Sequence, residues 1–144
     1  HIPCAGKLLS TRYIPGDLFS VNDLTTQALP GLFSSNERLV CEFESPSTGN
    51  FCVIFVGAML VAGIETLWGG VEQPGAGNVR EQHYDSTTHD FSKGGELGRF
   101  KFGSTAIMLF QADRCNWLET AKAGDEIRVG ERIAMLSTVV TADA

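Results

Sequence analysis

The sequence has few of the residues that build metal centres or bind nucleic acid. Its 144 residues include 3 histidines and 4 cysteines. No C-x-x-C or H-x-x-x-H spacing occurs among them, so a zinc site of the usual pattern is not expected. Lys and Arg number 11 against 17 Asp and Glu, and the net charge of −6 argues against a nucleic-acid-binding surface.

Long apolar segments are also absent. The longest apolar stretch, residues 52–64, is too short for a bilayer span, which takes about 20 residues. We find no signal peptide, and the chain opens on His1 without an initiator Met, so we expect the protein to extend upstream. The four cysteines, at positions 4, 41, 52 and 115, are expected to be free and mostly buried thiols in a reducing compartment.

The chain does contain a series of short β-type runs separated by turn signals. The runs cover residues 7–14, 38–44, 51–58, 60–68, 96–103, 105–111 and 132–138. Two of them alternate clearly. Leu39, Cys41 and Phe43 are expected to share one face of a strand, and two phenylalanines alternate with Arg and Lys over 99–102.

Helical periodicity is scarce. Residues 22–29 predict a short helix with Asn22 as its N-cap and Pro30 as its end, and residues 114–121 predict a second. The polar, glycine-rich stretch 73–90 is predicted to be an exposed loop. We therefore predict a single domain, mainly β and α+β at most. Its architecture is expected to be an antiparallel barrel-like or sandwich-like one with one or two short helices.

Ser104 stands where a β-type run is interrupted, in the sequence Phe-Gly-Ser-Thr at 102–105. Taken alone, it is most simply a strand-edge serine after a turn glycine, because the G-x-S-x-G pattern of a hydrolase elbow is missing. The glycine-rich stretch 93–100 lacks the Gly-Lys-Ser/Thr ending of a P-loop, so it is a weak phosphate site.

Two other residues attract attention. His1, in the sequence HIPCAG, is expected to be held by a fixed turn, although a lone histidine is more often structural than catalytic. Glu65 lies in an apolar run, where burial would be unfavourable without a partner. It is either a surface residue on the polar face of a half-exposed strand or a partner of Arg99 or Lys101.

Five blocks of the sequence together resemble the phosphatidylserine decarboxylase family. They read HIPCAG, PGDLFSVND, LFSSNERLV, VGAMLVAGIETLWGG and KGGELGRFKFGSTAIMLF, in this order along nearly the whole chain. The most specific marker is the Gly-Ser-Thr motif at 103–105, which the family usually precedes with Leu. Here Phe102 takes that position, an apolar replacement.

The resemblance implies a proenzyme that cuts itself between Gly103 and Ser104. The cut would leave a β chain, residues 1–103, and an α chain, residues 104–144, whose first residue becomes a pyruvoyl cofactor that forms a Schiff base with the substrate. Gly103 is expected to be the small residue of a strained turn. His1 matches the family histidine of the H-x-P-x-x-G block and takes the role of general base. Its aspartate partner is expected upstream of this chain.

The reaction implied by the resemblance is decarboxylation of phosphatidylserine to phosphatidylethanolamine and CO2. Phe19, Ser20 and Val21 match a segment that lines the substrate pocket, although an ordinary strand with Phe19 and Val21 in the core explains them equally well. Thr105 either supports the cleavage turn through its hydroxyl or is a structural β-branched residue. The resemblance implies no metal.

The resemblance also implies association with a membrane surface of the bacterial or mitochondrial inner-membrane type, peripheral as far as this chain shows. It implies that the α and β chains stay together, allows a homodimer, and implies no nucleic acid partner. His83 and His89 match no family position and are expected at the surface. Two alternatives stay open: a non-enzymatic β-barrel carrier or binding module, indicated by residues 123–136, and a family member that folds but never cleaves.

Overall fold

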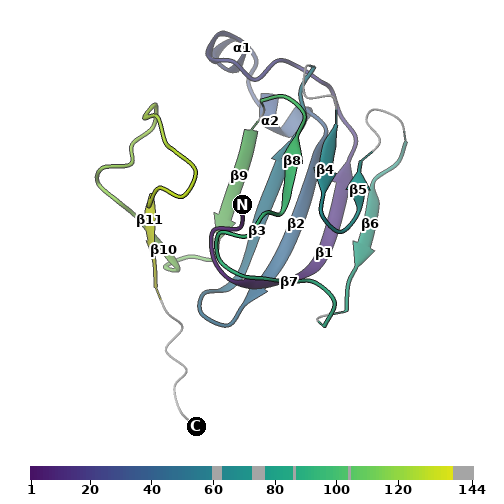
Figure 1. The fold of residues 1–144 in the computed structure, drawn as a ribbon. Helices are drawn as coiled ribbons and strands as arrows, with labels where there is room; N and C mark the ends of the chain where they lie inside the picture. The colour runs from purple at the N-terminus through teal and green to yellow at the C-terminus, as the bar shows by residue number, and fades with distance from the viewer. Residues whose placement is uncertain (60–62, 73–76, 86, 104, 138–144) are drawn as a thin grey trace.

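The computed structural model describes residues 1–59, 63–72, 77–85, 87–103 and 105–137. Figure 1 shows a large antiparallel sheet with a smaller sheet in front of it, two short helices at one end, and a separate hairpin at one side. All strand pairs recorded in the described residues are antiparallel. The mainly β prediction with short helices is therefore confirmed.

The large sheet has the strand order β6-β1-β2-β3-β9, and β7 also pairs with β1. Its strands are β1 (Gly6–Ile14), β2 (Arg38–Ser45), β3 (Gly49–Val56), β6 (Arg80–His83), β7 (Asp90–Phe91) and β9 (Thr105–Phe110). Strands β6 and β9 end this sheet and do not pair with each other within the described residues, so the sheet does not close into a barrel.

Two smaller sheets accompany it. The first has the order β5-β4-β8, and the second is the hairpin of β10 and β11. Their strands are β4 (Ile64–Thr66), β5 (Gly70–Val71), β8 (Gly98–Phe100), β10 (Cys115–Trp117) and β11 (Ala134–Leu136). The helices are α1 (Asp23–Ala28) and α2 (Leu32–Ser35), which lie between β1 and β2 in the chain.

The core lies between the large sheet and the segments in front of it. Leu39, Cys41 and Phe43 are fully buried on one face of β2, as their alternation predicts. Aromatic rings continue this face across the neighbouring strands, with the Phe43 and Phe51 centroids 5.2 Å apart and those of Phe51 and Phe110 5.7 Å apart. Residues of the front layer belong to the same cluster: Ile2, Cys4, Ile64 and Leu97. The arrangement is sandwich-like.

Helix α1 begins where the sequence places it. Asn22 is its N-cap, and the Asn22 side chain accepts a hydrogen bond of 3.0 Å from the Thr25 backbone N–H. The predicted helix at 114–121 is wrong, because this stretch contains strand β10, which pairs with β11. Asp113, with a φ of 62°, turns the chain just before β10. Long-range pairing here overrides a weak helical pattern.

The stretch 73–90 is exposed where described, apart from the half-buried Tyr84 and His89, but it is not only a loop. It contains β6 and the first residue of β7, both of which pair with β1. Strand β8 ends at Phe100, so Phe102 does not continue its alternation and is exposed. Of the predicted run 60–68, residues 60–62 lie outside the described residues and β4 covers only three of the rest. Within 123–137 the only strand is β11, so the two-strand pattern expected of a carrier domain at 123–136 is not found.

The buried carboxylate of Glu37 lies at the end of the core next to the helices. Glu37 is buried and accepts a 2.7 Å hydrogen bond at Oε2 from the Tyr13 hydroxyl. Its side chain lies against the backbone of Gly57, just beyond β3. A Cβ at position 57 would stand 2.5 Å from Glu37 Cγ and 2.6 Å from Glu37 Oε1. Gly57 therefore leaves the space in which this carboxylate is held.

Replacing Gly57 with alanine is expected to destabilise the fold by about 1–3 kcal/mol, because the new methyl group would overlap a buried side chain. Urea unfolding of the variant measures this loss. The control is the same substitution made with Glu37→Ala already in place. If Glu37 is the clashing group, the loss becomes smaller in that background. Equal losses in both backgrounds would show that the overlap lies elsewhere.

Candidate functional site

The side chain of Asn36 holds the predicted pocket segment, residues 19–21, at the end of the large sheet where α1 and α2 lie. The Asn36 Nδ2 donates to the Phe19 carbonyl at 2.7 Å and to the Gly57 carbonyl at 2.9 Å. The Phe19 backbone N–H donates to Asn36 Oδ1 at 3.0 Å. Asn36 thus joins a segment that follows β1 to the residue that follows β3.

Strand pairing brings Gly103 and Thr105, the described residues of the Gly-Ser-Thr motif, to the same end of the sheet. Thr105 pairs with Val56 at the first position of β9. Gly103 and Ala58 therefore lie just beyond the paired region, and both line a hollow of about 160 Å³. The other residues that line it are Ser20, Val21, Asn22 and Phe102. The structure thus brings two of the predicted pocket residues together with the predicted cleavage site.

The remaining pocket residue is placed differently. Phe19 does not line the hollow, and its side chain is partly exposed. Residues 18–21 form no strand, and neither Phe19 nor Val21 belongs to the buried core. The alternative reading of this segment as a core strand is therefore wrong. The backbone of Phe19, rather than its side chain, anchors the pocket segment, through the two hydrogen bonds to Asn36.

Gly103 is exposed, and the strained turn expected there stays a prediction, because the turn also includes Ser104. The φ of Gly103 lies outside the left-handed region. A Cβ added there would meet nothing within 4 Å. Neither crowding nor backbone handedness therefore requires glycine at this position in this structure. Ser104, the predicted nucleophile, lies outside the described residues.

Thr105 is a half-buried residue paired within the sheet, which accords with its structural reading. Support of the cleavage turn by its hydroxyl stays a prediction.

His1 is exposed, and the residues after it are tightly held. The Ile2 N–H donates to the Gly95 carbonyl at 2.8 Å, and the Gly94 N–H donates to the Ile2 carbonyl at 3.0 Å. Ile2 itself is buried in the core, which agrees with the expected fixed turn. Figure 1 shows the N-terminus in front of the large sheet, on the side where β8 lies. The role of His1 as a general base stays a prediction.

Comparison with known proteins identifies the family. The sequence model of the phosphatidylserine decarboxylase family matches residues 1–135. The chain belongs to this family. A phosphatidylserine decarboxylase proenzyme of Azotobacter vinelandii is 46% identical over 140 residues, which are 95% of this chain and 49% of the relative. Its counterpart in Pseudomonas entomophila is 45% identical over 138 residues, 94% of this chain and 48% of the relative.

A third decarboxylase proenzyme, from Acinetobacter baumannii, is 47% identical over 133 residues, which are 92% of this chain and 45% of the relative. The chain therefore spans about half the length of the curated relatives it matches. The Gly-Ser-Thr sequence at 103–105, on which the resemblance mainly rests, falls inside the matched region.

The cysteines of this family member offer no competing nucleophile. All four are free, as predicted; Cys4 and Cys41 are buried, and Cys52 and Cys115 are half-buried. Burial raises the pKa of each thiol above its usual value, most strongly for Cys41. A raised pKa keeps the thiol protonated and unreactive, so the described residues contain no activated cysteine.

The other residues that the sequence singles out lie away from the hollow. The side chain of His83 is 78% exposed, as predicted. His89 is half-buried, with its ring centroid 5.1 Å from that of Tyr84 and 6.5 Å from that of Trp68, so it lies only partly at the predicted surface. Glu65 lies opposite Arg99 in the β4–β8 pair, while the ion pair of Arg99, at 3.0 Å, is with Glu96.

No group of His, Cys, Asp and Glu among the described residues is arranged to hold a metal ion. In the same part of the chain, no helix is both long and apolar enough to cross a bilayer.

Asn36 is a residue of the site that was not predicted from the sequence. It lies in one of the blocks that resemble the family, and the available signal was a polar pair, Asn36 and Glu37, directly ahead of an alternating strand. Both are buried. A buried polar residue at the start of a strand requires partners, which only the folded chain reveals.

Proposed function

We propose that the full-length protein is a pyruvoyl-dependent phosphatidylserine decarboxylase, and that these residues form its cleavage site and part of its substrate pocket. The observation that carries the proposal is the hollow in which Gly103 meets Ser20 and Val21. Segments far apart in the sequence converge there on the motif that marks the family. Membership of the phosphatidylserine decarboxylase family supports the substrate class.

The proposed maturation step is a serinolysis. The Ser104 hydroxyl attacks the Gly103 carbonyl carbon while His1 takes the hydroxyl proton. The C–N bond then breaks, the leaving nitrogen receives that proton from His1, and an ester to the serine oxygen remains. A base then removes the Cα proton of residue 104, the Cβ–O bond breaks, and Gly103 leaves as a carboxylate. The resulting dehydroalanine tautomerises to an imine. Water hydrolyses it to the pyruvoyl ketone and releases ammonia.

The residues around Gly103 are suited to a site where the pyruvoyl group meets the serine head group of the substrate. Val21, Ala58 and Phe102 are apolar, and Ser20 and Asn22 carry hydrogen-bonding side chains. The pyruvoyl group supplies a ketone that a substrate amine can attack and a neighbouring carbonyl that accepts electrons as CO2 leaves. The apolar side chains make the surroundings of the carboxylate less polar, which favours its loss, while the polar ones orient the head group.

An activity assay of the full-length protein tests the proposal. Incubation with phosphatidylserine vesicles is expected to produce phosphatidylethanolamine and CO2. Pretreatment with hydroxylamine, which reacts with ketones, is expected to abolish the product. A protein that forms no phosphatidylethanolamine would overturn the proposed activity, and activity that resists hydroxylamine would overturn the pyruvoyl part.

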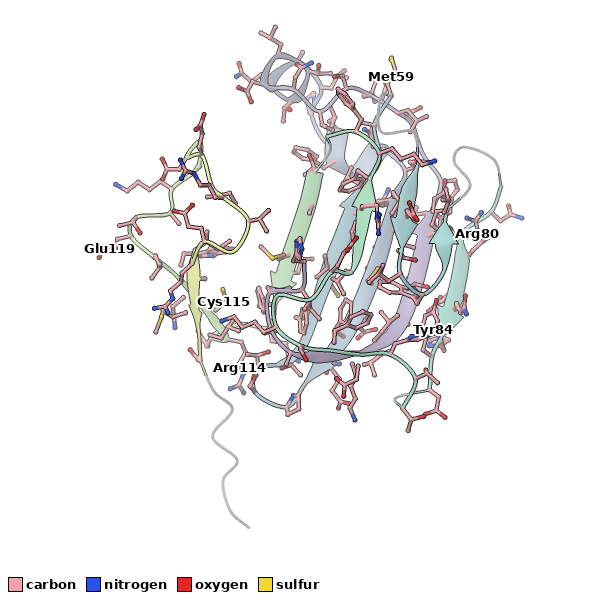
Figure 2. All side chains as sticks on the ribbon, viewed as in Figure 1. Met59, Arg80, Tyr84, Arg114, Cys115 and Glu119 are labelled. Atoms are coloured by element: carbon pink, nitrogen blue, oxygen red, sulfur yellow. The ribbon has the colours of Figure 1, made fainter. Side chains whose placement is uncertain are left out.

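We also propose that this end of the molecule contacts the membrane surface. Each segment that lines the hollow carries an exposed apolar side chain beside it. Leu24 follows Ser20–Asn22 and is 82% exposed, Met59 follows Ala58 and is 69% exposed, and Phe102 is 62% exposed. Figure 2 shows Met59 at the same end as α1, the helix that contains Leu24. Exposed apolar side chains beside a lipid site are typical of membrane contact.

The double substitution Leu24→Ser and Met59→Ser is expected to lower activity on vesicles by about 10-fold or more, since each apolar side chain contributes to bilayer binding. Activity on a short-chain, monomeric phosphatidylserine is expected to stay unchanged, because neither side chain lines the hollow. Comparing the two substrates with the same variant measures the effect.

The matched control is the double substitution Ile127→Ser and Val129→Ser. These side chains are also exposed, at 60% and 83%, but lie in the segment that joins β10 to β11. This control is expected to act like the wild type on both substrates. Equal losses for the two double variants, or a loss on the monomeric substrate as well, would contradict the membrane contact proposed for the Leu24 and Met59 surface.

A further inference from the structure

The side chain of Asn36 bridges two walls of the hollow. One wall is Ser20–Asn22, which follows Phe19, and the other is Ala58, which follows Gly57 just beyond β3. The Asn36 side chain is completely buried, and its amide oxygen and nitrogen both have partners in these walls. The side chain thus acts as a link between segments that do not otherwise pair as strands.

Backbone hydrogen bonds among the described residues fix the chain at Asp17 and at Gly57, on either side of Asn36. Asp17 N–H donates to Ser35 O at 2.9 Å, and Glu37 N–H donates to Asp17 O at 2.9 Å. On the other side, Gly57 N–H donates to Glu37 O at 2.8 Å. These bonds align residue 17 and residue 57 with the start of β2. Beyond residue 17, within the part of the chain that the structure describes, the pocket segment is joined to the start of β2 by the two hydrogen bonds between Phe19 and Asn36.

From this arrangement we infer that Asn36 is a positioning residue of the substrate site, which sets the separation between Ser20–Val21 and Ala58 beside Gly103. The inference rests on the proposed function, because it assigns the hollow to the substrate head group. Asn36 lies behind the lining and acts through Phe19 and Gly57 rather than by touching the substrate.

The link requires an amide. Nδ2 donates to two carbonyl oxygens while Oδ1 accepts from one N–H, and a carboxamide supplies both functions within the same volume. An ionised aspartate keeps the acceptor but turns a second oxygen towards the carbonyls of Phe19 and Gly57. Both carbonyls, of which that of Gly57 is buried, would then lose their donor, and the walls are expected to move apart.

The test is Asn36→Asp in the full-length protein. We expect self-cleavage to be complete, KM for short-chain phosphatidylserine to rise by about 10- to 100-fold, and kcat to fall much less, because a widened pocket weakens binding of the head group. Lowering the pH is expected to reduce the KM defect, because a protonated aspartic acid regains one donor. A merely structural role would lower the amount of folded enzyme and leave KM unchanged.

The matched control is Asn116→Asp, the same chemical change at an exposed asparagine of the hairpin. It is expected to leave KM and its pH dependence unchanged. Should Asn36→Asp fail to fold, hydrogen exchange of the wild type supplies an independent measurement. The Phe19 N–H is expected to exchange slowly, although it lies outside any strand or helix, because its acceptor is the buried Asn36 side chain.

An unchanged KM in folded Asn36→Asp, or rapid exchange of the Phe19 N–H in the wild type, would overturn the positioning role while leaving the decarboxylase proposal intact. A wild type that forms no phosphatidylethanolamine would instead overturn the proposed function, and this inference with it. The two failures are thus told apart by the activity of the unmodified protein.

Discussion

Ser104→Ala is expected to leave the protein as a single uncut chain without phosphatidylserine decarboxylase activity. Alanine has no hydroxyl to attack the Gly103 carbonyl, so the ester cannot form and the pyruvoyl ketone cannot arise. We expect activity at least about 10³-fold below the wild type, since the group that accepts electrons from the substrate is missing. Denaturing electrophoresis and the vesicle assay measure both effects.

Two further variants make this result specific. Ser104→Thr keeps a hydroxyl but is bulkier, and is expected to slow the cut rather than abolish it. Ser92→Ala removes an exposed serine far from the motif in the sequence and is expected to cut like the wild type. A Ser104→Ala protein that still divides into two chains would show that another residue starts the cleavage.

His1→Ala is expected to slow self-cleavage by about 10²- to 10⁴-fold, the usual contribution of a general base. The side chain of His1 is exposed, so its removal is expected to change the free energy of unfolding by no more than about 0.5 kcal/mol. The adjacent Ile2 stays buried and hydrogen-bonded, which keeps the local backbone in place. The rate at which newly made protein is cut measures the effect.

The control for this variant is His83→Ala, which removes another exposed histidine from strand β6. It is expected to be cut at the wild-type rate. A His1→Ala protein that matures as fast as this control would show that the base is another group.

Local pattern was enough to predict the centre of the fold. The alternation of Leu39, Cys41 and Phe43 places a buried face in β2, because every second residue of a strand points to the same side. Asn22 marks the start of α1, since a helix needs an acceptor for its first N–H groups. Both signals reside within a few residues and need no knowledge of the rest of the chain.

Long-range pairing was not predictable in the same way. The residues of β10 have a weak helical pattern and become a strand only because β11 pairs with them. The polar residues of β6 have little strand propensity of their own and are ordered by pairing with β1. Such outcomes depend on which segments meet, and a single sequence contains no direct record of that.

The same division applies to the candidate site. The family motif at 103–105 and the segment at 19–21 are visible in the sequence, and the structure brings Ser20, Val21 and Gly103 around one hollow. The role of Asn36 could not be predicted from the sequence, because its hydrogen-bond partners Phe19 and Gly57 are 17 and 21 residues away. The strained turn expected at Gly103 rested on its residue type and stays a prediction. The φ of Gly103 lies outside the left-handed region, and Ser104, the next residue of the turn, lies outside the described residues.

Mass spectrometry of the purified full-length protein tests self-cleavage at Gly103–Ser104 most directly. We expect two polypeptides, one ending at Gly103 and one beginning at residue 104. The second is expected to weigh less than a chain beginning with serine, by the mass of one ammonia molecule, and to resist N-terminal sequencing. A single intact chain, or a second polypeptide that begins with unmodified serine, would contradict the formation of a pyruvoyl group from Ser104.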